Sequence, residues 1–392
     1  MRNPTTRPPR RGRLTLMAAL ALAACTQAPA NGQPDQAPPP APAAPTGEQP
    51  PVRVVTVATG LEHPWGIAFL PGGDILVTER PGRLRLIRGG TLVEAPIAGV
   101  PEVWARGQGG LLDVALHPQF ASNRLVYLAY SKPGPGGATT AIARGRLEEG
   151  RLADVQDVYV AEAWGTRGQH FGSRIVFDRE GYLYFSIGDR GEMNRAQNLA
   201  DNAGGVLRLH DDGRVPSDNP FVGRSGVRPE MYSYGNRNIQ GMQIHPRTGE
   251  LWAVEHGPRG GDEINLIRPG RNYGWPEITH GIDYSGAQIT PDTARAGMEQ
   301  PLHHWTPSIA VAGMTIYDGD VFPAWRGNLF AAALAGQHVA RVELDGTRPV
   351  REERLFDDMG HRFRQVATAP DGTLYLLVDH ASAPVLRVEP AR

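Results

Sequence analysis

A histidine between glycines is the first residue whose setting suits chemistry. His170 lies in Arg167–Arg174 (RGQHFGSR), directly before an apolar segment of strand type. The nearby glycines let backbone or a ligand approach the ring, which suits a neutral imidazole that accepts a proton. The alternative is a turn histidine bonded to a carbonyl, and spacing alone favours that alternative.

Two later segments carry arginines suited to acidic ligands. Arg237 lies in Tyr234–Gly241 (YGNRNIQG), where amides flank it, so its guanidinium is either free for an acid or a developing oxyanion, or simply solvated. Arg362 and Arg364 lie in Gly360–Gln365 (GHRFRQ). The period of two on a strand places both on one face, as a paired fork for several carboxylates or as a charged edge strand.

A fourth region offers oxygen ligands. Glu255–Glu263 (EHGPRGGDE) contains a Gly-Pro turn and carboxylates, and Asn272–Pro276 (NYGWP) follows it. Main-chain carbonyls and carboxylates are the hard ligands that calcium prefers. The spacing is not that of a helix-loop-helix calcium site, so the pattern is not specific for a metal by itself.

Composition excludes several other kinds of site. The formal charge is −1, which gives no overall field toward nucleic acid or an anionic membrane. The single cysteine, Cys25, excludes disulfides within the chain and thiolate metal sites. Lys132, the single lysine, lies in SKPG, outside any phosphate-binding or Schiff-base motif.

A repeat of short strands must position these segments. An apolar strand, a Pro or Asp, a Gly turn and a second apolar strand recur six times, with the first strands centred at Ala68, Ala115, Val176, Gln243, Thr315 and Ala367. The 48 glycines and 35 prolines favour tight turns over long helices. We therefore predict an all-β fold, a six-bladed β-propeller, with a large β-sandwich as the competing architecture. The longest intervals lie between the third and fifth repeats, where we expect site-forming loops.

The first fifty residues predict export. Residues 1–25 combine five arginines, the apolar run Leu14–Ala24 and Cys25, which is typical of a lipoprotein-type signal peptide, although ordinary signal cleavage is the alternative. Residues 26–50 form a Pro/Ala-rich tether, and residues 51–392 form one domain. We expect a periplasmic protein that touches a bacterial envelope membrane only through a lipid anchor at Cys25.

Taken in order, these segments resemble the soluble quinoprotein glucose and aldose sugar dehydrogenases, six-bladed propellers that use pyrroloquinoline quinone (PQQ) and calcium. The resemblance covers residues 55–390 and is most specific at Gly107–Ala115 (GQGGLLDVA), Gly168–Gly172, Tyr234–Asn238 and residues 257–275. It implies oxidation of the anomeric hydroxyl of an aldose to a lactone, by hydride transfer to PQQ and onward to an external electron acceptor. The chain lacks the long loops of the dimeric enzymes, which favours a monomer.

The resemblance also implies roles for individual residues. His170 would be the base that takes the anomeric proton, Arg237 would polarise the quinone oxygen, and Gln108 would orient the substrate. The residues implied to bind the cofactor are Gln108, Arg237, Asn238, Tyr284, Arg362 and Arg364. The residues implied to bind calcium are Gly257 and Pro258 through their carbonyls, and Glu263 and Tyr273 at a second, structural site.

One position departs from the family. Ala335 stands where the family pattern has a lysine that touches the quinone. Loss of a charged donor to a carboxylate costs about 1.5–3 kcal/mol, or roughly one to two decades of affinity. Gln337 or Arg341 would be the substitutes.

Two other functions remain open from the sequence. A calcium-dependent propeller lactonase needs side-chain oxygens converging on a channel metal, and the Arg362–Arg364 pair speaks against it. A non-catalytic sugar-binding envelope scaffold is supported by Ala335 alone.

Overall fold

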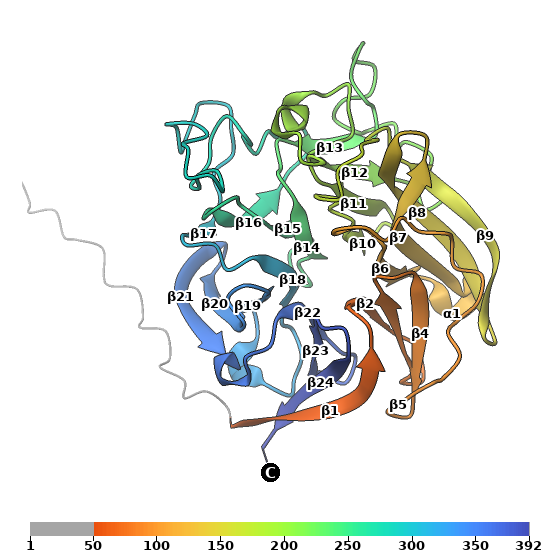
Figure 1. Ribbon diagram of the computed structural model, residues 1–392. Helices are drawn as coiled ribbons and strands as arrows, with labels where there is room; N and C mark the ends of the chain where they lie inside the picture. The colour runs from red at the N-terminus through yellow and green to blue at the C-terminus, as the bar shows by residue number, and fades with distance from the viewer. Residues whose placement is uncertain (1–50, 392) are drawn as a thin grey trace, which may run out of the picture. The chain divides into compact units, whose positions relative to one another are not determined.

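Six antiparallel sheets of four strands each follow one another around a ring (Figure 1). The computed structural model describes residues 51–391. The first three sheets contain β2 (Pro64–Phe69), β3 (Ile75–Glu79), β4 (Arg83–Arg88) and β5 (Thr91–Leu92); β6 (Leu111–Leu116), β7 (Leu125–Gly134), β8 (Gly137–Glu148) and β9 (Arg151–Val160); and β10 (Ile175–Phe177), β11 (Leu183–Ile187), β12 (Gly205–Leu209) and β13 (Met231–Tyr234). The last three contain β14 (Ile239–Ile244), β15 (Leu251–Glu255), β16 (Asp262–Ile267) and β17 (His303–Trp305); β18 (Val311–Ile316), β19 (Leu329–Ala333), β20 (Val339–Asp345) and β21 (Arg348–Leu355); and β22 (Phe363–Thr368), β23 (Leu374–Val378), β24 (Ala383–Pro390) and β1 (Val52–Leu61).

The predicted six-bladed propeller is confirmed. The six repeat positions fall on the six innermost strands, which are β2, β6, β10, β14, β18 and β22. Each repeat in the sequence consists of the innermost strand of a blade, the turn after it and the second strand. The sandwich alternative is wrong, because the sheets follow one another around a central axis rather than stacking as two layers.

The two ends of the described chain close the ring. In Figure 1, β1 (orange) lies beside β24 (blue), and the two pair antiparallel from Val52 opposite Pro390 to Leu61 opposite Ala383. This pairing completes the last blade and removes two long unpaired edges. The predicted signal peptide and tether lie outside the described residues.

The core lies between the blades. The second strands β11, β19 and β23 are buried along their whole length, because a neighbouring blade covers each face. Six hydrophobic clusters each join two successive blades. A seventh, smaller cluster joins Trp65, Leu112, Ala138 and Phe171. It lies next to the candidate site and anchors the loop that carries His170.

The loops at one end of the ring carry the polar residues of interest. Because antiparallel strands alternate in direction, the loops before the innermost strands and those after the second strands lie at the same end. They supply Arg80, Gln108, His170, Asp189, Arg237, His256, Arg362 and Asp379.

Helices are short in this fold. The described residues contain one α-helical turn, α1 (Phe120–Asn123), and three 3-10 helices, η1 (Met193–Gln197), η2 (Pro323–Trp325) and η3 (Asp357–Met359). Within residues 51–391 there is no helix long and apolar enough to cross a membrane.

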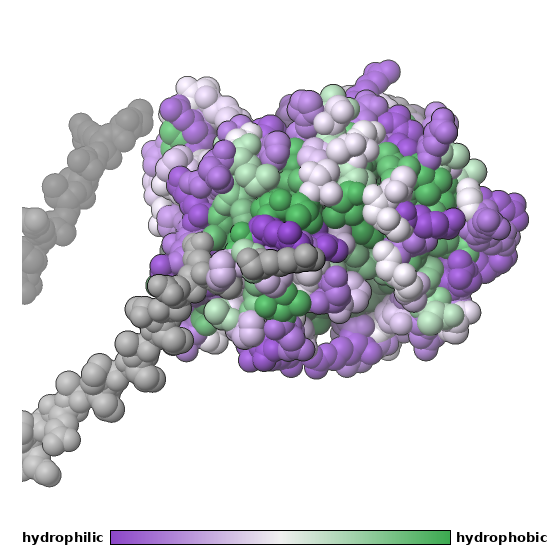
Figure 2. Space-filling view, turned by 90° about the horizontal axis from the view of Figure 1, so that it is seen from below, coloured by the Kyte–Doolittle hydropathy of each residue, from purple (hydrophilic) through white to green (hydrophobic). Residues whose placement is uncertain are grey.

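One face of the molecule combines polar and apolar residues. In Figure 2, hydrophilic residues surround a smaller hydrophobic area on the face seen from below. Among the described residues, few large hydrophobic side chains are exposed, and Tyr284 is the most exposed of them at 69%. Its position beside the candidate site gives that exposure a functional meaning.

Candidate active site

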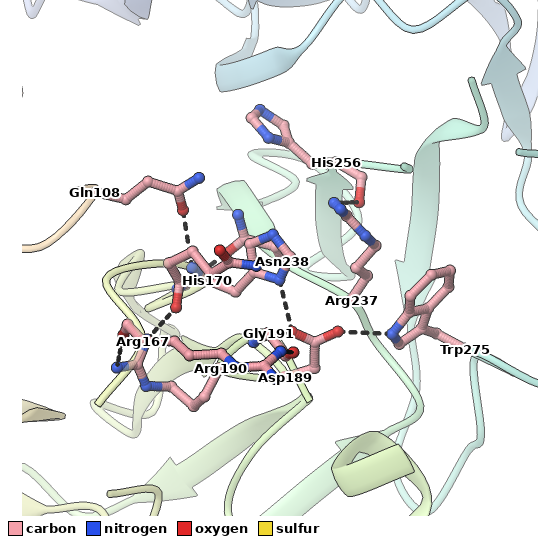
Figure 3. A network of polar contacts seen from close by, with 12 residues as sticks. Gln108, Arg167, His170, Asp189, Arg190, Gly191, Arg237, Asn238, His256 and Trp275 are labelled. Atoms are coloured by element: carbon pink, nitrogen blue, oxygen red, sulfur yellow. Dashed lines mark hydrogen bonds and ion pairs between the residues drawn. The ribbon is translucent and has the colours of Figure 1, made fainter. Parts of the chain in front are cut away.

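The imidazole of His170 is buried and has one free nitrogen. The loop before β10 places His170 in the left-handed region, at φ 56°, and leaves it 6% exposed. Its Nδ1 lies 2.6 Å from the Asp189 carboxylate (Figure 3). A carboxylate partner holds the proton on Nδ1, so Nε2 is left as the proton acceptor. The alternative of a turn histidine bonded to a carbonyl does not describe this ring.

Asp189 links the histidine to the next blade. It follows β11, and its carboxylate also accepts hydrogen bonds from the Gly191 amide at 2.7 Å and the Trp275 indole at 2.8 Å. Figure 3 shows the carboxylate between His170 and Trp275. Sequence reasoning missed this residue, although an aspartate between Gly188 and Gly191 at a strand end was an available signal.

The main chain around His170 is fixed from both sides. The Gln108 side-chain oxygen accepts the His170 amide at 2.8 Å. Arg190, which is fully buried, donates to the carbonyls of Arg167 and Gln169, and its guanidinium lies 3.5 Å from the Phe171 ring centroid. These contacts hold the loop in a conformation that a free chain rarely adopts.

The electrostatic surroundings keep the imidazole neutral. Burial lowers the pKa of His170 below its ordinary value, and the positive charges of Arg237 and Arg190 lower the pKa further, against the opposing hydrogen bond to Asp189. The ring is therefore unprotonated at neutral pH and ready to act as a base.

Arg237 is a buried cation without a carboxylate partner. Its guanidinium donates to the carbonyls of Gly257 at 2.8 Å and His256 at 3.2 Å, and to the Tyr284 hydroxyl at 3.5 Å. It also lies 5.4 Å from the Trp275 ring centroid. Within residues 51–391, no carboxylate is within ion-pair distance of this guanidinium. The charge is therefore available to an oxygen that becomes negative.

A cavity of about 290 Å³ brings four of the predicted residues together. Gln108, Tyr284, Arg362 and Arg364 all line it. The other polar groups in its wall are Arg80, Gln240, His256 and Asp379. Sequence reasoning did not select Arg80 or Asp379, because neither lies in a distinctive local motif.

Arg362 and Arg364 share one carboxylate, that of Asp379. The Asp379 carboxylate lies 3.5 Å from Arg364 and 3.7 Å from Arg362. Arg364 also donates to the Gln240 side-chain oxygen at 3.1 Å. The Arg362 side chain is 48% exposed and that of Arg364 is 10% exposed, so the pair runs from the mouth of the cavity into its wall.

One side-chain amide and one imidazole near the cavity each have a nitrogen without a hydrogen-bond partner. Asn238 is fully buried and does not itself line the cavity; its oxygen accepts the Gly172 amide at 3.1 Å. In the described part of the chain, Asn238 Nδ2 and His256 Nε2 have no hydrogen-bond partner. Burial, with Arg237 and Arg364, lowers the pKa of His256 to about 3, so its ring is neutral. Unpaired buried polar groups of this kind are typical of a ligand site.

The predicted first calcium position has a competing cation. The Gly257 carbonyl, one of the two predicted ligands, accepts a hydrogen bond from Arg237. The Pro258 carbonyl accepts none from the residues described. Calcium at these two oxygens therefore has to share the Gly257 oxygen with a guanidinium or displace it.

The predicted second calcium position holds a buried carboxyl group, Glu255, and a partly buried one, Glu263. Glu255, Glu263 and Tyr273 line a very small cavity of about 10 Å³. Burial raises the pKa of Glu263, and the neighbouring Glu255 raises the pKa further. The Tyr273 hydroxyl is occupied by the Leu266 carbonyl and the Arg268 amide, so its main-chain carbonyl is the oxygen left for a metal. Two neighbouring carboxyl groups whose ionisation burial disfavours, and a space of about one atom, suit a divalent cation that would favour their charged forms.

The position of the missing lysine is not filled by the residues we expected. Ala335 and Gln337 are exposed in the turn after β19, outside the cavity wall. Arg341 lies on β20 and is bound to Asn328, Glu343 and Glu353. The proposal that Arg341 substitutes for the lysine is therefore wrong, because that guanidinium is already neutralised in its own blade.

The comparisons with known proteins agree with this geometry. The family model described as "Glucose / Sorbosone dehydrogenase" matches residues 61–387. The chain belongs to the glucose/sorbosone dehydrogenase family. It is 45% identical over 345 residues to the aldose sugar dehydrogenase YliI of Escherichia coli, covering 86% of this chain and 93% of that protein.

Solved structures of the glucose/sorbosone dehydrogenase family share the fold over most of its length. The soluble aldose sugar dehydrogenase of Escherichia coli in its apo-form has a TM-score of 0.85 at 45% identity, covering 87% of this chain and 100% of that one. The PQQ-bound aldose sugar dehydrogenase of Streptomyces coelicolor has a TM-score of 0.73 at 30% identity, covering 87% and 99%. This chain is accordingly an enzyme of the sugar-dehydrogenase type.

Proposed function

We propose that this enzyme oxidises the anomeric hydroxyl of aldose sugars to lactones, with PQQ bound in the cavity as the acceptor. The observation that carries the proposal is a neutral, oriented imidazole, His170, beside a cavity lined by three arginines against one aspartate. Such a set suits an acidic redox cofactor and an alcohol substrate.

The residues of the cavity fit PQQ. The cofactor carries three carboxylates, and the wall holds three arginines against one aspartate. A volume of about 290 Å³ lies at the lower end of the range for small-molecule sites. Arg362 and Arg364 would bind carboxylates, Tyr284 would form the outer wall, and His256 Nε2 would find a partner. When bound, PQQ supplies the acceptor for two electrons and the anomeric hydrogen.

The side chains of the site divide the remaining work. His170 Nε2 takes the proton of the anomeric hydroxyl, and Asp189 stabilises the imidazolium that results. Arg237 stabilises negative charge that develops on the acceptor oxygen. Gln108, which already binds the His170 amide through its oxygen, has its Nε2 left to orient the sugar. Calcium is a further proposed component, at the Gly257 and Pro258 carbonyls or at Glu263.

A reconstitution experiment tests the proposed function. Apoprotein is mixed with PQQ, calcium or both, and reduction of an electron-accepting dye is followed with a panel of aldoses, alongside hydrolysis of lactones. We expect aldose-dependent dye reduction that requires PQQ and is increased by calcium. Lactone hydrolysis without PQQ would instead favour a lactonase, although the described residues contain no group of three or more His, Cys, Asp or Glu side chains placed to hold a metal.

The acid limb of the pH profile should report His170. The base works only when unprotonated, so kcat/KM should fall as the pH drops through the pKa of His170 and level off above it. Because burial lowers the pKa of His170, the limb should lie below about pH 6.5, the ordinary pKa of histidine. Steady-state kinetics of the PQQ-loaded enzyme from about pH 4.5 to 8 would measure it. A limb above about pH 7 would contradict the assignment.

Calcium should stabilise the protein through Glu263. We expect calcium to raise the apoprotein's midpoint of thermal unfolding by about 2–5 °C at a concentration well above Kd, because it binds two neighbouring carboxyl groups. Glu263→Gln should remove this response and leave the apoprotein about as stable, since burial and Glu255 already disfavour the charged form of Glu263. The matched control is Glu149→Gln, at an exposed turn between β8 and β9. An unchanged calcium response in Glu263→Gln would place the metal elsewhere.

We also propose that the enzyme is exported and held at the envelope through Cys25. This rests on the arginine-rich and apolar pattern of residues 1–25. A monomer that passes electrons to an external acceptor is compatible with such a tether.

A further inference from the structure

Arg80 occupies a position that four of the six blades use to build the wall of the cavity. It directly follows β3, as His256 follows β15, Leu334 follows β19 and Asp379 follows β23. The pairing registers support this equivalence, because Glu79, Glu255, Ala333 and Val378 are each paired with the first residue of an innermost strand. All four following residues line the same cavity. The repeat therefore directs Arg80 toward the site, although it lies outside the motifs that resemble the family.

The main chain of Arg80 is held in place from two sides. Its amide donates to the His63 carbonyl at 3.1 Å, and its carbonyl accepts the Leu111 amide at 3.0 Å. A Cβ at Gly110 would lie 1.9 Å from the Arg80 carbonyl oxygen and 2.7 Å from its Cγ. Gly110 therefore lets the segment that carries Gln108 pass directly over Arg80, which places both side chains in one wall.

The guanidinium of Arg80 has no partner of its own. Among the described residues, it makes no hydrogen bond and lies within ion-pair distance of no carboxylate. Arg362 and Arg364, by contrast, share Asp379. Arg80 is nonetheless close to that group. Burial, chiefly, and the charges of Arg80, Arg174 and Arg362 lower the pKa of Arg364 to about 10, against the opposing charge of Asp379. The charge of Arg80 also lowers the pKa of Asp379.

We propose that Arg80 is a third carboxylate-binding residue of the cavity, taking the place of the cation that Ala335 cannot provide. The inference rests on the proposed function. Three guanidinium groups then face the three carboxylates of PQQ, and the ligand relieves the repulsion between cations that the free protein contains. A guanidinium binds a carboxylate through two hydrogen bonds, which makes it an effective replacement for a lysine.

The test measures binding of PQQ to apoprotein by tryptophan fluorescence quenching and by titration calorimetry. We expect Arg80→Gln to raise the Kd for PQQ by about 10- to 100-fold, and Arg80→Lys to raise it less. Arg354→Gln is the matched control, because Arg354 is an exposed arginine on the outermost strand β21 and its loss changes the net charge equally. The Kd of Arg80→Gln should also depend less on salt than that of the unaltered protein.

Thermal unfolding separates ligand binding from a structural role. Arg80 is repelled by Arg364 but attracted to Asp379 in the apoprotein, so Arg80→Gln should unfold at about the same temperature without PQQ, and should gain less stability when PQQ is added. A lower unfolding temperature without PQQ, together with an unchanged Kd, would overturn the inference.

The remaining outcomes are equally decisive. If the unaltered protein binds no PQQ, the proposed function fails; if it binds PQQ and Arg80→Gln binds equally well, only this inference fails. If Arg80→Gln does not fold, a crystal structure of the PQQ complex decides, and a distance above about 4 Å between the Arg80 guanidinium and every carboxylate of PQQ would overturn it.

Discussion

Replacing His170 with glutamine is expected to lower kcat for aldose oxidation by about 100- to 10,000-fold, the usual contribution of a positioned base. Glutamine nearly fills the space of the imidazole, and Asp189 can still accept a hydrogen bond from it. It cannot take a proton from the sugar, however. Dye-linked steady-state kinetics of PQQ-loaded protein measures the effect, with the Kd for PQQ expected to stay within a few-fold of its original value.

The control for this experiment is a histidine at the opposite end of the ring. His210 lies in the turn between β12 and β13 beside Tyr182, remote from the cavity, and His210→Gln should leave kcat unchanged. Partial recovery of activity by added imidazole in a His170→Ala variant would identify the missing group as the base. Near-normal turnover in His170→Gln would show that another residue takes the proton.

Replacing Asp189 with asparagine should have the second largest effect, about 1,000-fold or more in kcat. The asparagine amide can donate to His170 Nδ1, which moves the ring proton to Nε2 and blocks the nitrogen that must act as the base. The imidazolium formed during the reaction also loses its negative partner. Trp275 keeps an oxygen acceptor in this variant, whereas the Gly191 amide, which shares Oδ1 of Asp189 with His170, loses its acceptor.

The pH profile distinguishes this positioning role from a structural one. The hydrogen bond from His170 to Asp189 raises the pKa of His170 against the effect of burial. Its loss should move the acid limb of kcat/KM to lower pH while the plateau falls. Asp345→Asn, at an exposed aspartate paired with Arg348 on an outer hairpin, is the control and should change neither. An acid limb at its original pH would argue that Asp189 only supports the fold.

The sequence by itself determined the architecture. Each blade repeats an apolar strand, a turn and a second apolar strand, and the second strands are buried on both faces, so their apolar runs are unbroken. This local pattern is enough to place the six innermost strands. Local motifs drew attention to His170, Arg237 and the Arg362–Arg364 pair but left a bland alternative open for each, and only the resemblance to the family gave them roles.

The tertiary structure decided which side chains act together. Asp189, Trp275 and His170 are far apart in sequence, and only the adjacency of two blades joins them through one carboxylate. The same closure brings Arg80, from the first complete blade, beside Arg364 and Asp379, from the last. Pairing of β20 with β21 within one blade sets Arg341 against Glu343 and Glu353, which removes it from the site. A strand pattern records which face is apolar, but the partner of a charged group depends on distances across the ring, and those exist only once the ring is closed.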